Sequence, residues 1–125
     1  MEHRHARMAG IGLAHFCSAV VVLQVGTFYA YVLRARLALG VWPIPYRPDP
    51  KDLEFSAHHN VVLLGGVATL MLTPFLAVVL IGAAKALRVP RGILARAALM
   101  FAVCYVGFVV LCYVDPGRFA EWMID

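Results

Sequence analysis

Long runs without charge constrain the fold of this chain more than any other feature. Residues 8–33, 55–84 and 97–114 contain no Asp, Glu, Lys or Arg. Each run is close to, or longer than, the about 20 residues (about 30 Å of helix) that cross the apolar core of a bilayer. A helix satisfies its own backbone polar groups in lipid. The runs therefore predict an all-α integral membrane protein with three transmembrane helices.

Composition agrees with this class of protein. Hydrophobic residues make up 62% of the chain and charged residues 14%, whereas soluble proteins average about 45–50% and about 25%. We expect a single transmembrane domain over residues 1–125, with spans at about 8–33, 56–88 and 91–114, a polar loop at 34–55 and a tail at 115–125. The first run is longer than the about 7–15 apolar residues of a signal peptide, so we expect it to remain in the mature protein.

The basic residues predict an orientation rather than a nucleic-acid partner. Although the net charge is +4, the Lys and Arg residues stand at the ends of the apolar runs, where such residues anchor and orient membrane helices. One side would carry Arg4, Arg7, Lys85, Arg88, Arg91 and Arg96, and the other Arg34, Arg36, Arg47, Lys51 and Arg118 together with six of the seven acids. We expect a bacterial inner membrane protein with its N-terminus in the cytoplasm and its C-terminus outside.

Two Asp-Pro pairs predict helix starts outside the membrane. Asp49 suits an N-cap and Pro50 a first helical position, so the second helix could begin there and project beyond the hydrocarbon. Asp115-Pro116 would start a short interfacial helix in the tail. Aromatic side chains favour the headgroup layer, and the interfacial anchors that we expect are Trp42, Tyr46 and Trp122.

Small residues at a spacing of four predict close helix packing or contact with a partner chain. The first helix carries such a ridge at Gly10, Ala14, Ser18, Gly26 and Ala30, and the second at Gly65, Thr69, Thr73 and Ala77. His15 and Gln24 are nine residues apart and so lie on opposite faces of the first helix. A polar side chain that faces lipid is costly, and two helices can hardly cover both faces of a third. This predicts an oligomer or a subunit of something larger.

The adjacent His58 and His59 are the strongest candidates for chemistry. Glu54 precedes His58 by four residues, a spacing that allows a metal site or a simple ion pair. We expect the pair mainly to be interfacial or to contact a partner, with haem or metal binding and a pH-sensitive contact as alternatives. His15 could join a haem site only from an antiparallel partner, because it lies near the opposite membrane surface.

Other catalytic signals are missing from the sequence. All seven carboxylates lie outside the three apolar cores, so no acid is available for a proton-coupled or cation-coupled transporter. Cys17, Cys104 and Cys112 lie within the runs and do not form a CxxC pair, so we expect small buried hydrophobes and no metal site. We therefore predict a protein that is not an enzyme. We expect no cofactor, with haem as the alternative, and we expect bound lipid.

Three functional hypotheses follow. The first is a non-catalytic accessory or structural subunit of a larger membrane complex, with membrane lipid and other membrane chains as partners and no nucleic acid. The second is a homo-oligomeric channel or pore lined by Gly65, Thr69 and Thr73. The third is a haem-binding or quinone-adjacent membrane anchor of an electron-transfer complex, using His58, His59 or His15.

Overall fold

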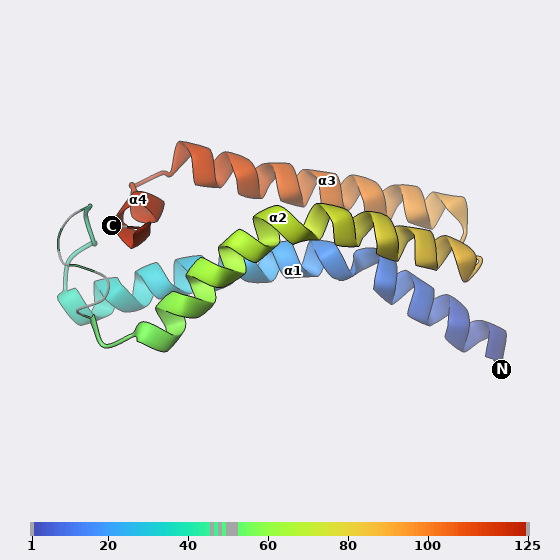
Figure 1. The fold of residues 1–125 in the computed structure, drawn as a ribbon, viewed down its shortest axis with the longest axis horizontal. Helices are drawn as coiled ribbons and strands as arrows, with labels where there is room; N and C mark the ends of the chain where they lie inside the picture. The colour runs from blue at the N-terminus through green and yellow to red at the C-terminus, as the bar shows by residue number, and fades with distance from the viewer. Residues whose placement is uncertain (1, 46, 48, 50–52, 125) are drawn as a thin grey trace.

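The computed structural model describes residues 2–45, 47, 49 and 53–124, and it is an elongated helical bundle (Figure 1). Three long helices, α1 (Glu2–Leu39), α2 (Ser56–Ala86) and α3 (Arg91–Val114), are followed by the short α4 (Phe119–Ile124). In α1 (over residues Arg7–Leu39), α2 and α3, length and apolar composition suffice to cross a membrane. The all-helical part of the predicted fold class is therefore confirmed.

α1 runs further than the expected end of the first span. It continues through Arg34 and Arg36, which we placed in a loop, to Leu39. Gly40 then takes the left-handed conformation (φ 72°) and its N–H donates to the carbonyl of Arg36. Glycine adopts this conformation without steric cost and commonly ends a helix in this way.

α2 begins at Ser56, not at Asp49-Pro50. Glu54 has a φ of 51° and Phe55 a ψ of 28° with a φ of −103°, and neither pair of angles continues an α-helix. Residues 50–52, including the predicted first helical position, lie outside the described residues. Asp49 therefore does not cap α2.

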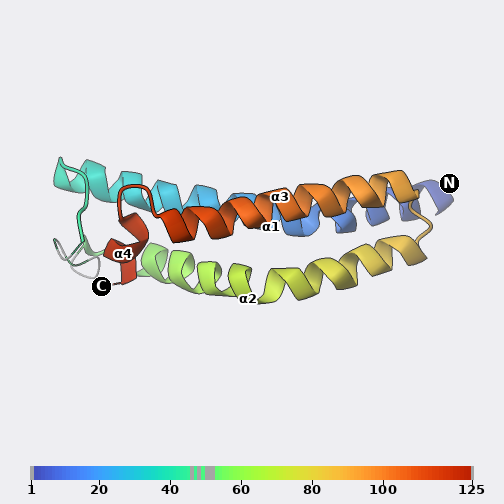
Figure 2. The ribbon, with the colours of Figure 1, turned by 90° about the horizontal axis from the view of Figure 1, so that it is seen from above.

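Pro74 lies inside α2, and a neighbouring helix accommodates it. Proline has no N–H, so the carbonyl of Leu70 four residues earlier loses its helical donor. The hydroxyl of Tyr105 in α3 donates to that carbonyl at 2.6 Å, and α2 changes direction near its middle (Figure 2). The hydrogen bond from α3 therefore replaces the one that proline removes.

A tight turn that contains Pro90 joins α2 to α3. Arg88 is left-handed (φ 58°), and α3 begins at Arg91 directly after Pro90. The side chain of Val89 in this turn is buried, and a Cβ atom at Gly10 would lie 2.5 Å from its Cγ2 atom. The glycine at position 10 therefore allows the turn to pack directly against the α1 backbone.

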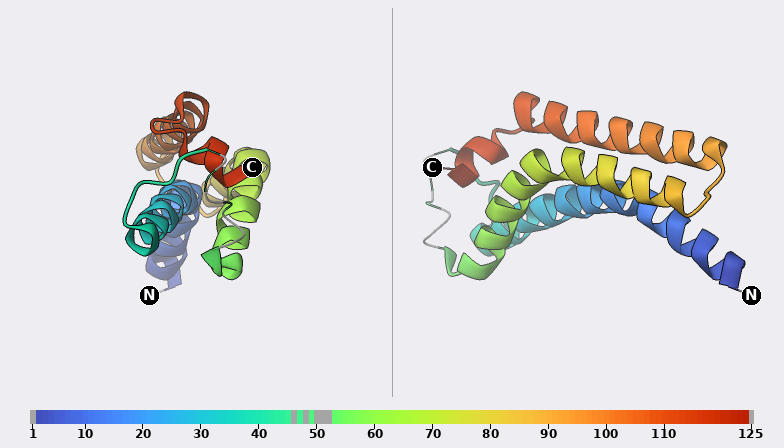
Figure 3. Two further views of the ribbon diagram at one scale, coloured as in Figure 1. Left: turned by 90° about the vertical axis from the view of Figure 1, so that its left-hand side faces the viewer. Right: turned by 45° about the vertical axis from the view of Figure 1, so that its right-hand side comes forward.

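The buried residues form two clusters at opposite ends of the bundle. The cluster at the α2–α3 turn consists of small and aliphatic residues: Ala14, Ala84, Val89, Leu94 and Ala97. The second cluster, next to α4, contains larger side chains and is called the aromatic cluster after Tyr31 and Trp122; its other members are Ala35, Val62 and Met123. Viewed end on, α4 lies between the ends of α2 and α3 (Figure 3), so the last residues of the chain complete the second cluster.

Candidate functional site

The predicted histidine pair lies in the aromatic cluster, between α1 and α2. His59 is 8% exposed, and its Nδ1 atom lies 3.3 Å from the hydroxyl of the fully buried Tyr31. The Nε2 atom of His58 lies 3.3 Å from the carbonyl oxygen of Thr27. Because a carbonyl can only accept, His58 must donate from Nε2 in this contact. Both histidines are thus held by α1 of the same chain.

Tyr31 is the centre of this cluster. Its ring stacks on Trp122, with centroids 5.7 Å apart, and meets His58 edge-on at 5.0 Å. Trp122 is completely buried, whereas we expected it on the surface as an interfacial anchor. Its placement differs because α4 turns back across the end of the bundle and inserts this side chain among Tyr31, Ala35 and Val62.

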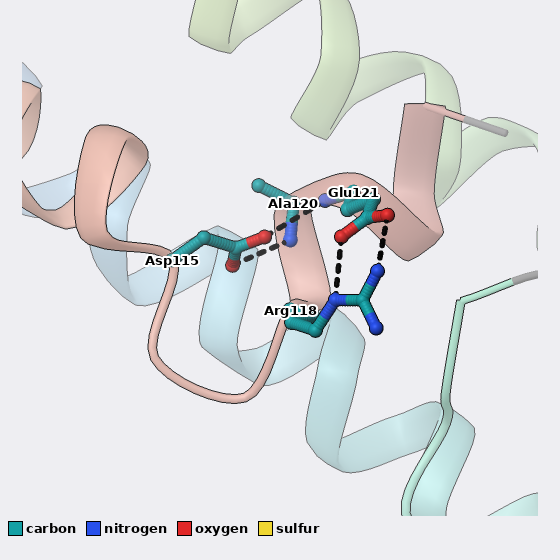
Figure 4. Close-up of polar contacts among 4 residues, drawn as sticks. All are labelled: Asp115, Arg118, Ala120 and Glu121. Carbon is teal, nitrogen blue, oxygen red and sulfur yellow. Dashed lines mark hydrogen bonds and ion pairs between the residues drawn. The ribbon is translucent and has the colours of Figure 1, made fainter.

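Hydrogen bonds within the segment between α3 and α4 stabilise the change of chain direction before α4 (Figure 4). Asp115 adopts a left-handed conformation, and its carboxylate accepts hydrogen bonds from the N–H groups of Ala120 and Glu121 at 2.8 and 2.9 Å. Arg118 donates two hydrogen bonds to Glu121, at 2.7 and 2.6 Å. The Asp115 carboxylate therefore caps the first turn of α4, but the helix start predicted at Asp115-Pro116 is wrong, because α4 begins only at Phe119.

Gln24 joins α1 to α2 near the middle of the bundle. Its amide nitrogen donates to the carbonyl oxygen of Val62 at 2.8 Å, and the residue is 9% exposed. A Cβ atom at Gly65 would lie 2.5 Å from the Gln24 amide oxygen, and one at Gly66 would lie 3.5 Å from the amide nitrogen. Gly65 therefore leaves room for the buried amide, whereas a Cβ atom at Gly66 would make only an ordinary van der Waals contact.

A cavity of about 250 Å³ lies beside Gln24 and extends toward α4. All four helices contribute to its wall, which is mainly apolar. The lining includes Gln24, Phe28, Val62, Gly66, Phe108, Leu111, Asp115 and Met123.

His15 lies apart from the other two histidines. Thr27, which His58 contacts, is 12 residues further along α1, or about 18 Å at the helical rise. The Nδ1 atom of His15 and the hydroxyl of Ser18 are buried without a hydrogen-bond partner in the described part of the chain. Within one chain, His15 therefore cannot share a ligand with His58 or His59.

The small-residue ridge of α1 divides between two faces. Gly10, Ala14 and Ser18 are buried in the bundle, whereas Gly26 is exposed, with no atom within 4 Å of an added Cβ. A step of four residues overshoots a full helical turn by about 40°. A ridge of this spacing therefore winds around a straight helix, and its later members leave the packed face.

The ridge of α2 stays inside the bundle. Thr69 and Thr73 are buried, and the Thr73 hydroxyl donates to the carbonyl of Thr69. The pore hypothesis stays a prediction, but these two lining residues would have to leave their present packing.

The remaining predicted anchors lie in the loop after α1. Trp42 is 48% exposed, and the guanidinium of Arg36 lies 3.9 Å from the centre of its ring. Tyr46 lies outside the described residues. Anchoring by Trp42 in the headgroup layer stays a prediction.

The contact between His58 and Thr27 affects the haem hypothesis. Binding iron through Nε2 would require this side chain to give up its contact with Thr27. No group of three or more His, Cys, Asp or Glu among the described residues could hold a metal ion. The haem hypothesis also stays a prediction.

Comparison with protein-family models, with curated proteins and with solved structures finds no match to this chain. Its function must therefore be inferred from its own geometry. Sequence reasoning missed Tyr31 and Tyr105 as packing residues. For Tyr105 a signal existed, because Pro74 frees a carbonyl that needs a donor from a neighbouring helix.

Proposed function

We propose that α1, α2 and α3 cross a bilayer and that the protein serves, without turnover of its own, as an accessory subunit of a larger membrane assembly. The observation that carries this proposal is a face of α1 that α2, α3 and α4 leave uncovered. The small residues Gly12, Ala19 and Gly26 recur on it every seven residues, and all three are exposed. A step of seven residues drifts by only about 20°, so the three share one side of the helix.

Large side chains alternate with the small ones on this face. Phe16, Leu23 and Leu33 are exposed between or after the small positions. A Cβ atom at Gly12 or Gly26 would meet no atom within 4 Å in the described structure. Small residues let the backbones of membrane helices approach closely, and larger side chains beside them fill the gaps. The face therefore suits a helix from another chain.

The distribution of charge supports an orientation for this proposal. Arg7, Lys85, Arg88, Arg91 and Arg96 are all exposed at the end that holds the α2–α3 turn. The opposite end carries four described Arg residues, Arg34, Arg36, Arg47 and Arg118, so the turn end has a small excess of basic residues. By the positive-inside rule, the N-terminus and this turn would face the cytoplasm of a bacterial inner membrane, with the C-terminus outside.

The proposal is tested by native mass spectrometry of the tagged chain, extracted in mild detergent from the membrane that naturally contains it. We expect heterologous chains in the same peak as this chain. The substitutions Gly12→Leu and Gly26→Leu, made together, should release them because they fill the close-approach positions. As a matched control, Gly107→Leu adds the same side chain at an exposed position of α3 and should retain the partners.

Two outcomes would overturn the proposal. A wild-type chain that is a monodisperse monomer would show that the α1 face binds only lipid. A mass that is a whole-number multiple of the chain's own would indicate a homo-oligomer instead of an accessory subunit.

A further inference from the structure

The cavity beside Gln24 is unusual because helix packing normally leaves few voids larger than a water molecule. At about 250 Å³, it exceeds apolar cavities of about 150 Å³ that stay dry and accept small apolar molecules. Two contacts between helices bound it lengthwise. The Tyr105–Leu70 hydrogen bond holds α3 to α2 near the middle of the bundle, and Trp122 docks α4 at the far end.

Two polar side chains of the cavity wall, Gln24 and Asp115, already make hydrogen bonds within the chain. Gln24 donates its amide N–H to Val62, and its amide oxygen packs against Gly65. The carboxylate of Asp115 accepts from the N–H groups of Ala120 and Glu121. Apart from Tyr29 and Cys112, the rest of the wall is apolar and includes Phe28, Val62, Phe108 and Met123. This lining favours an apolar ligand.

The cavity opens through the side of the bundle. Val67, Leu70 and Leu111 line it and are also exposed on the outer surface. All three lie in helices that are long and apolar enough to cross a bilayer. The molecules that surround such an opening in a membrane are lipids.

We propose that this cavity binds the hydrocarbon tail of a membrane lipid, which enters sideways from the bilayer and leaves its headgroup outside. The site goes beyond the subunit role, since it requires membrane insertion but no partner chain. The hydrocarbon could come from the acyl chain of a phospholipid or from a polyisoprenoid, and the two sources share the same chemistry.

The test is photolabelling of the full chain reconstituted in phosphatidylcholine bilayers. One arm contains phosphatidylcholine with a diazirine near the end of its acyl chain, and the other contains a polyisoprenoid alcohol with the same group. Labelled residues are mapped by mass spectrometry. Phe108 and Met123 are diagnostic because they line the cavity but are buried, whereas Leu99 is exposed on the outside of α3.

We expect both buried residues to be labelled, and the arm that labels them identifies the source of the tail. Gly66→Leu and Leu111→Trp, which fill the cavity from two different helices, should each lower this labelling about tenfold, the effect of displacing about two methylene groups. Labelling of Leu99 should be unchanged. Gly82→Leu adds the same side chain elsewhere on α2, at an exposed position, and should leave all labelling unchanged.

The proposal would be overturned if Phe108 and Met123 stayed unlabelled in both arms. Equal labelling in the two filled variants and the wild type, with circular dichroism confirming that both variants are folded, would also overturn it. Because the purified chain is used alone, neither result bears on whether the α1 face binds a partner.

Discussion

The two ends of the bundle pack in different ways. At the α2–α3 turn, small residues such as Ala14, Ala84 and Ala97 bring the backbones close together, and even a Cβ at Gly10 would collide with Val89. At the other end the cluster contains the larger side chains Tyr31 and Trp122, and a cavity lies next to two of its other members, Val62 and Met123. Close packing of small residues leaves no space for a ligand, whereas large side chains that meet at their rings leave space alongside. The comparison therefore favours the aromatic end for the proposed lipid site.

Removing the largest side chain should break the aromatic end most severely. We expect Trp122→Ala to lower the free energy of unfolding in detergent by about 3–5 kcal/mol, because a fully buried ring is lost. The half-exposed Trp42 provides the control. Trp42→Ala should cost about 1 kcal/mol, mainly through its contact with Arg36. Equal losses for the two variants would show that α4 is not docked.

The tight end should respond to an enlarged side chain instead. Ala97 is fully buried in the small-residue cluster, so Ala97→Leu should cost about 1–3 kcal/mol by overpacking. Its exposed neighbour Ala98 is the matched control, and Ala98→Leu should have little effect. A neutral Ala97→Leu, measured by the same denaturation assay, would contradict the close packing of this end.

The smallest effect concerns the hydrogen bond from Tyr105 in α3 to Leu70 in α2, midway between the two ends. Tyr105→Phe should cost about 1 kcal/mol, because the Leu70 carbonyl then has no donor. In a Pro74→Ala background, the restored N–H of residue 74 can bond to the same carbonyl, so Tyr105→Phe should cost clearly less there. A double-mutant cycle measures this difference, and additive costs would show that the two residues are not coupled.

Particular residues show what the sequence could and could not predict. The three long helices, the short turn at Pro90 and the Asp115 cap were predictable, because each depends on hydrophobicity or backbone rules within a few residues. The packing of Gly65 against Gln24 was predictable only as a ridge of small residues, since the sequence does not say which side chain fills the gap. For Trp122, local rules were misleading. An interfacial aromatic and a buried aromatic look alike in sequence, and the difference lies in the left-handed residues Asp115 and Arg118, which turn α4 back across the bundle.

The hydrogen bond between Tyr105 and Leu70 also has a consequence for the order in which the protein is made. Synthesis proceeds from the N-terminus, so Leu70 and Pro74 are complete before Tyr105 has been added to the chain. When the α1–α2 hairpin first forms, the Leu70 carbonyl therefore lacks the donor that it has in the complete bundle. In the proposed bilayer setting a carbonyl without a donor is costly, so insertion of α2 before α3 would require water or the insertion machinery to supply the donor. α2 becomes a fully hydrogen-bonded helix only when the next helix arrives beside it.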